Sequence, residues 1–120
     1  MHTHSLHTRL ARIPLKKGSR KKFEDLVAYM KEHYDEYQFE SSQKGYWWDS
    51  VFYEEGTEQD TLWITSKSPA WDMIKGDQDI ETTHFRKVYD VFRQECWLVE
   101  RLEAEHFMES IWDPYWEIST

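Results

Sequence analysis

Two residues of this chain, His84 and Asp49, carry reactive side chains at positions where the surrounding pattern predicts burial. His84 shares a helical stripe with Ile80 and Val88, so the spacing predicts that its imidazole points toward a sheet. A neutral imidazole, with an ordinary pKa of about 6.5, can act as a general base near neutral pH. A core histidine satisfied by a hydroxyl or carbonyl group would show the same pattern. His84 is therefore a candidate catalytic residue, with structural packing as the alternative.

Asp49 lies between Trp47 and Val51 on one face of a predicted strand. A carboxylate among aromatic rings either pairs with a cation or has its pKa raised by the loss of water. Arg12, on the first predicted strand, is the candidate partner, and a structural ion pair is one interpretation. Without that partner, Asp49 becomes a second candidate acid or base beside an aromatic pocket.

Several further residues are candidates for lining such a pocket. One is a histidine at the edge of the apolar stripe of the first predicted helix, and three are aromatic residues of the predicted strands. Ordinary packing is the alternative for each of them. The candidate substrate-binding residues are Trp47, Tyr53, Trp63, His33 and Arg12.

A di-metal centre is one alternative, because Glu81-x-x-His84 and Glu103-x-x-His106 repeat the spacing found in di-iron carboxylate bundles. Those bundles require four long helices, whereas the middle of this chain has the pattern of strands. No Gly-rich phosphate loop is present, so no nucleotide cofactor is expected. The sequence assigns no cofactor; haem or a single metal ion, held through His84 with or without His33, is left as a minor interpretation.

Composition limits the class of protein. The 120 residues carry a net charge of −8, which would repel phosphate backbones, so no nucleic-acid partner is expected. No apolar run approaches the roughly 20 residues of a membrane span, and the N-terminus lacks the apolar core of a secretory signal. The single cysteine, Cys96, fits a reducing compartment, so we expect a cytoplasmic protein. Aromatic residues form 17% of the chain and predict a core built from rings.

The elements that must position these residues follow from periodicity and from turn residues. Ser19 is the expected N-cap of the first helix, and Gly45 follows its expected end near 40–43. One domain is expected over 8–106, between a flexible N-terminus at 1–7 and an aromatic extension at 107–120 that docks on the body or on a partner subunit. The predicted elements are a strand over 8–15, a helix from 19, strands over 46–53 and 61–65, a short helix over 68–76, a helix from 80 and a strand over 97–102.

The strand over 46–53 places large apolar groups on both of its faces, because alternate residues of a strand point to opposite sides. A single layer of helices covers only one face of a sheet, so the other face needs a second cover. The element order is that of the ferredoxin-like split β-α-β fold, an α+β class with a four-stranded antiparallel sheet. Face-to-face pairing of two such sheets would form a dimeric α+β barrel.

Three segments carry a resemblance to a known family: Arg12–Gly18 before the first helix, Trp48–Phe52 in the strand, and Glu81–His84 before the second long helix. With the element order, they resemble a small uncharacterised bacterial domain family. That family belongs to the dimeric α+β barrel superfamily, which includes the antibiotic-biosynthesis-monooxygenase-like proteins. The resemblance covers roughly residues 8–103, and it implies a ligand site between the sheet and the helices of one subunit.

The leading hypothesis is a homodimer that binds a small, apolar or aromatic molecule. The resemblance implies that such a protein, if it is an enzyme, works without a nucleotide cofactor as a monooxygenase, isomerase or cyclase. A non-catalytic module for ligand binding or dimerisation is the first alternative, and a haem or metal protein of the same fold is the second. Whether the chain is an enzyme stays open at this point.

Overall fold

Alternating residues build a four-stranded antiparallel sheet, as the sequence predicts. The computed structural model describes residues 7–108 and 110. The strand order is β2-β3-β1-β4, which is compatible with a ferredoxin-like arrangement because β1 lies between β3 and β4, two strands that do not follow it directly in sequence. The strands are β1 (His7–Lys16), β2 (Trp48–Glu54), β3 (Gln59–Ser68) and β4 (Leu102–Ala104).

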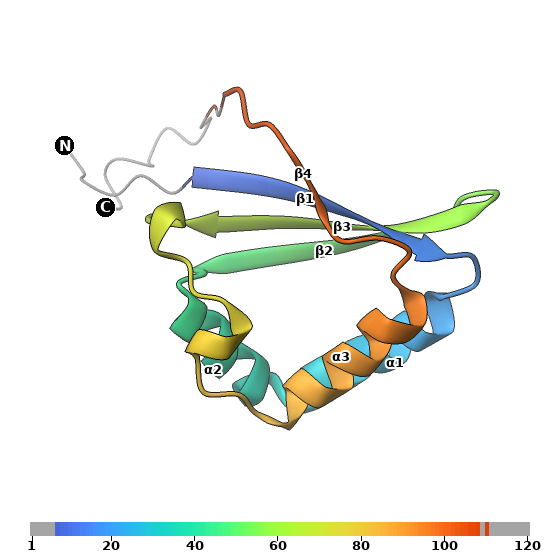
Figure 1. Cartoon of the computed structure of the whole chain (residues 1–120), viewed down its shortest axis with the longest axis horizontal. Coiled ribbons are helices and arrows are strands. Elements are labelled where there is room, and N and C mark those ends of the chain that lie inside the picture. The colour runs from blue at the N-terminus through green and yellow to red at the C-terminus, as the bar shows by residue number, and fades with distance from the viewer. Residues whose placement is uncertain (1–6, 109, 111–120) are drawn as a thin grey trace.

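The three helices all cover one face of this sheet (Figure 1). The sequence predicts one long first helix, but the structure breaks it at His33, whose φ of −116° and ψ of 47° are not helical. Two helices result, and Figure 1 shows that α2 turns away from the line of α1. Gly45 ends α2 with a left-handed φ of 107°, as its position predicts. The helices are α1 (Arg20–Glu32), α2 (Tyr34–Lys44) and α3 (His84–Cys96).

The helix predicted from Ile80 begins later, at His84, because its first turn is capped from another helix. Thr83 is extended, with φ −114° and ψ −179°, and makes no side-chain cap. Two carboxylates of α2 accept the free N–H groups instead: Glu36 Oε1 from Phe85 N at 2.8 Å, and Glu40 Oε2 from Thr83 N at 2.8 Å. This contact fixes α3 against α2.

Between β3 and α3 the chain makes two short 3₁₀ turns, η1 (Trp71–Met73) and η2 (Asp77–Asp79), where the sequence predicts one short helix over 68–76. The last strand is also displaced from its predicted range. Trp97 forms only an isolated bridge with Leu15, and β4 begins at Leu102. The predicted flexible N-terminus covers 1–7, but His7 already belongs to β1; residues 1–6 and most of the predicted aromatic extension lie outside the described residues.

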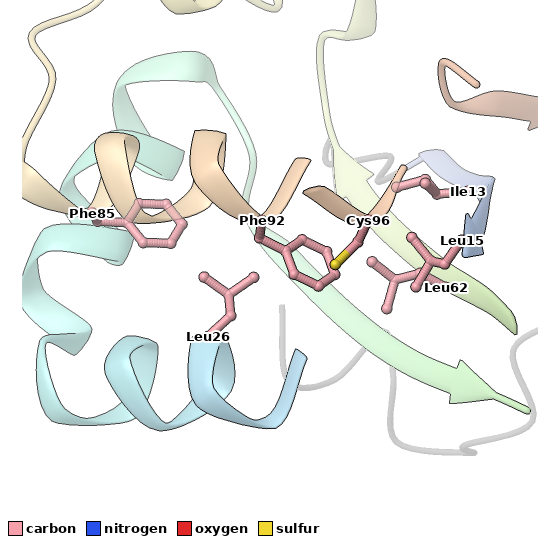
Figure 2. Close-up of a cluster of buried hydrophobic side chains, with 7 residues drawn as sticks. All are labelled: Ile13, Leu15, Leu26, Leu62, Phe85, Phe92 and Cys96. Atoms are coloured by element: carbon pink, nitrogen blue, oxygen red, sulfur yellow. The ribbon is translucent and has the colours of Figure 1, made fainter. Parts of the chain in front are cut away.

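The hydrophobic core lies at one end of the sheet, where α1 and α3 pack side by side. Figure 2 shows its side chains meeting between strands and helices. Each is at most 4% exposed, so this end is closed. Cys96 is part of this core and is a free thiol. The core residues are Ile13, Leu15, Leu26, Leu62, Phe85, Phe92 and Cys96.

The opposite face of the sheet carries exposed apolar side chains. Trp48 is 47% exposed, Phe52 56% and Leu102 42%. On β2, Trp48 and Phe52 alternate with Asp49 and Val51, which face the helices, and this confirms the prediction that apolar groups lie on both faces of this strand. Among the residues that the structure describes, no helix combines the length and apolar character needed to cross a membrane.

Candidate functional site

A cavity of about 780 Å³ lies between the sheet and the helices, beside the closed core. Strands β2 and β3 form one wall, and residues of all three helices form the other. Exposed charged residues at Lys31, Lys75 and Glu100 lie along the lining, so the cavity opens to solvent there. The lining includes Tyr37, Tyr46, Asp49, Val51, Ile64, Ser66, Phe85, Arg86, Tyr89, Arg93, Trp97 and Arg101.

Asp49 reaches the cavity from β2, opposite Ser66 of β3. The Tyr37 hydroxyl of α2 donates a hydrogen bond of 2.8 Å to Asp49 Oδ2. The other oxygen, Oδ1, is buried and has no hydrogen-bond partner in the part of the chain that the structure describes. Burial, and then the charge of Asp49, raise the pKa of Tyr37, so the phenol keeps its proton and remains a donor.

Trp97 lies at the C-terminal end of α3 and lines the same cavity. Its ring packs edge-on against Tyr89, with 6.2 Å between centroids, and the Arg93 guanidinium lies 5.4 Å from its centroid. The indole Nε1 is buried and, within residues 7–108 and 110, has no hydrogen-bond acceptor. A buried indole N–H usually finds a partner, so this donor is unusual.

The cations of α3 along the cavity are already paired with acids. Arg86 donates to Glu40 Oε1 at 3.0 and 3.1 Å, and Arg93 donates to Asp90 at 2.6 Å. Both guanidinium groups also lie within 6 Å of the Tyr89 ring centroid. Burial raises the pKa of Tyr89 despite these nearby positive charges.

Arg101 lies beside Tyr46 at the wall of the cavity. Its charge and a hydrogen bond act to lower the pKa of Tyr46, but burial outweighs them and raises it. Arg101 is exposed and forms no ion pair with any residue in the described ranges. It is therefore a cation at the wall without an acidic partner there.

The predicted pairing of Asp49 with Arg12 is wrong. Strand β3 separates β2 from β1, and Arg12 is opposite Trp63 on the other face of the sheet, where it is exposed. The expectation failed because it assumed that the first strand lies next to the strand of Asp49. Asp49 does lie beside aromatic residues, but its partner is the phenol hydroxyl of Tyr37 and not a cation.

The predicted orientation of His84 is also wrong. His84 is the exposed first residue of α3, and its ring is 5.9 Å from that of Tyr29, outside the cavity lining. The predicted helical stripe of Ile80, His84 and Val88 does not form, because the chain from 80 to 83 is not helical. His33 stacks on the same Tyr29 at 4.3 Å and also lies outside the lining.

The three aromatic residues predicted to shape the pocket are elsewhere. Trp47 precedes β2 and is 58% exposed. Trp63 faces the bare side of the sheet and donates from Nε1 to Glu54 at 2.9 Å. Tyr53 faces the helices, but at the closed end, where it bonds to Asp60. None of the three lines the cavity as described.

Sequence reasoning missed Tyr37 and Trp97 as site residues. Tyr37 follows the helical spacing of the apolar residues in the first helix, which predicts simple packing, but a buried phenol needs a partner and Asp49 is an available acceptor. Trp97 was assigned to the last strand, and its lack of an acceptor depends on distant residues that local patterns do not specify.

Within residues 7–108 and 110, no three His, Cys, Asp or Glu side chains gather in a group that could hold a metal ion. No protein-family model, curated protein or solved structure matches this chain. The resemblance to the dimeric barrel superfamily therefore stays a prediction, and the site has to be interpreted from its own geometry.

Proposed function

We propose that this chain binds a small, largely apolar or planar molecule in the cavity between the sheet and the helices. The observation that carries the proposal is Asp49, which presents a buried carboxylate oxygen without a hydrogen-bond partner among the described residues, at the wall of a ring-lined cavity. A buried, unsatisfied acceptor of this kind costs roughly 1–3 kcal/mol, which a donor group on a ligand would offset. The cavity volume also falls within the roughly 300–1,000 Å³ of small-molecule sites.

If the protein is an enzyme, Asp49 is the group best placed for proton transfer. Tyr37 holds Oδ2 and leaves Oδ1 to accept a proton from a bound O–H, N–H or acidic C–H group. Returning that proton to another atom of the same molecule is an isomerisation, which needs neither a metal nor a redox partner. Among the reaction types that the resemblance implies, the isomerase type therefore uses this geometry most directly. A non-catalytic binding protein would use the same carboxylate for recognition.

A pair of neighbouring substitutions on β3 tests whether the cavity is the binding site. Ile64 lines the cavity, whereas Thr65 points to the other face of the sheet. Ile64→Trp should obstruct part of the cavity and weaken the binding of planar aromatic compounds measured by calorimetry, while Thr65→Trp should leave binding unchanged. Equal binding by both variants would place the site elsewhere.

We further propose that the bare face of the sheet pairs with a second copy of this chain. The support is the exposure of Trp48, Phe52 and Leu102 on that face, since large apolar side chains exposed on one face favour an interaction site. A homodimer formed there would bury the face of the sheet that the helices leave bare, which the apolar residues on both faces of β2 require. Light scattering at micromolar concentration tests this proposal, and a monomer would contradict it.

A further inference from the structure

We propose that the ligand of this cavity is an elongated, neutral planar molecule with a hydrogen-bond donor at one end and an acceptor at the other. The donor, a hydroxyl or N–H group, would bind Asp49, and the acceptor, a carbonyl or ether oxygen, would bind the indole N–H of Trp97. This inference rests on the proposed function of the cavity and specifies the chemistry of its ligand.

Two buried side-chain atoms lack a hydrogen-bond partner in the described part of the chain: Asp49 Oδ1 and Trp97 Nε1. Both residues line the same cavity. One atom only accepts and the other only donates. Because folded proteins satisfy about nine in ten buried polar groups, two exceptions of opposite type in one cavity call for a common explanation. A ligand with complementary ends would satisfy both.

The two atoms come from opposite ends of the helix-covered face. Asp49 is in the same row of the sheet as Arg9, through Ser66, whereas Trp97 bridges Leu15. Arg9 and Leu15 are six residues apart on β1, so the two backbone rows are roughly 20 Å apart at about 3.3 Å per residue. Even after both side chains reach inward, a compact group would not contact both, so the ligand must be elongated.

A continuous series of rings joins these two ends. Tyr37, which bonds to Asp49, meets Phe85 at 5.5 Å. Phe85 meets Tyr89 at 5.8 Å, and Tyr89 meets Trp97 at 6.2 Å. The surface between the two polar atoms is therefore aromatic, which favours a planar ligand that packs along the rings.

The charges along this series favour a neutral ligand. Arg86 and Arg93 lie over the rings but already pair with Glu40 and Asp90. An anionic group would be repelled by Asp49 at the donor-binding end, and a cation would meet Arg101, which acts on Tyr89 and has no acidic partner among the described residues. A neutral molecule with polar ends avoids both costs.

Four biphenyl probes test the inference on the full chain: biphenyl, para-hydroxybiphenyl, para-acetylbiphenyl, and biphenyl with a hydroxyl on one terminal para carbon and an acetyl on the other. Calorimetry gives the dissociation constant of each. Each polar group should tighten binding about tenfold relative to the probe that lacks it. Asp49→Leu should remove the gain from the hydroxyl only, and Trp97→Phe the gain from the acetyl only.

Ratios between probes are taken within one protein, so a general change of cavity shape cancels. Trp63→Phe, on the bare face, is the matched control and should keep both gains. If Asp49→Leu fails to fold, Asp49→Asn replaces it; the amide should keep the fold and weaken the hydroxyl gain.

The outcomes separate the two proposals. If all four probes bind the unmodified protein within twofold of one another, the cavity binds planar molecules but the two polar atoms do not select them, and this inference is overturned. A polar gain that persists in both Asp49→Leu and Trp97→Phe also overturns it. If none of the probes binds, the proposed function itself fails.

Discussion

Two aspartates on the same face of the sheet, Asp60 and Asp49, are each bonded by a tyrosine hydroxyl, yet their surroundings differ. Asp60 is 1% exposed and accepts from Tyr53, from Gly18 N at 3.2 Å and from Gly56 N at 3.3 Å. Its second oxygen also lies 3.5 Å from the Lys17 ammonium. Asp49 has one partner, Tyr37, and one buried oxygen without a partner among the described residues.

The difference separates a structural carboxylate from a candidate functional one. At the Asp60 end the charge joins the hairpin turn to the start of α1, and the neighbouring core is closed. At the Asp49 end α2 lies at an angle to α1, and residues of α2 and β2 line a cavity. A buried carboxylate with complete hydrogen bonding contributes to the fold, whereas one with a spare oxygen at a cavity wall is available for a ligand.

The largest expected effect is on stability when each carboxylate is removed. Asp60→Ala leaves a phenol and two backbone N–H groups without an acceptor, so it should lower the free energy of unfolding by about 4 kcal/mol. Asp49→Ala leaves only the Tyr37 phenol without an acceptor and removes one unsatisfied oxygen, so it should cost about 1 kcal/mol. Urea unfolding followed by circular dichroism measures both. Equal losses of unfolding free energy in the two variants would contradict the difference in hydrogen bonding between Asp60 and Asp49.

A second comparison uses apolar residues of the two ends. Leu15 is fully buried in the closed core, whereas Ile64 lines the cavity and is only partly buried. Leu15→Ala should therefore lower the free energy of unfolding by about 3 kcal/mol and Ile64→Ala by about 1 kcal/mol. A side chain at a cavity wall makes fewer packing contacts, so its truncation removes fewer of them. The same urea titrations give both values. An Ile64→Ala loss as large as that of Leu15→Ala would indicate a filled cavity.

A third prediction concerns acid. Burial by itself would raise the pKa of Asp60, but hydrogen bonds from Tyr53 and Gly56 and the charge of Lys17 hold it below its ordinary 3.8. The unfolded chain then takes up this proton first, so the stabilisation is complete above about pH 5 and is lost as the pH falls through 3.8 toward the folded-state pKa. The stability difference between the unmodified protein and Asp60→Asn should therefore shrink below about pH 4. A difference that stays constant down to pH 3 would contradict this account.

The smallest expected effect on stability is on the bare face. Phe52→Glu should change the free energy of unfolding of the monomer by less than about 0.5 kcal/mol, because the ring is 56% exposed. It should still dissociate the proposed dimer, since two carboxylates would be buried near the interface. Thr57→Glu, in the hairpin turn, adds the same charge away from that face and should leave the dimer intact. Light scattering distinguishes the two variants, and a dimer that survives Phe52→Glu would rule out this interface.

Parts of the fold followed from local pattern and parts did not. Two runs of aromatic and β-branched residues around a polar segment predicted β2 and β3, and glycine predicted the end of α2, because both signals depend on neighbouring residues. The break at His33 was missed because apolar residues recur at helical spacing on both sides of it. The start of α3 was missed because its caps, Glu36 and Glu40, come from α2. Ser19 begins α1 as predicted, but its hydroxyl donates to the Lys16 carbonyl and makes no cap.

The sequence by itself determined that Asp49 shares one strand face with Val51 and Tyr53, because side-chain direction in a strand has a period of two. It also determined the excess of rings from which the core and the cavity wall are built. Only the tertiary structure decided that Tyr37, rather than Arg12, is the partner of Asp49, and that Asp60 rather than Asp49 is fully bonded. The reason is that hydrogen-bond partners of buried groups come from segments far apart in the chain, and strand order and helix direction bring these together.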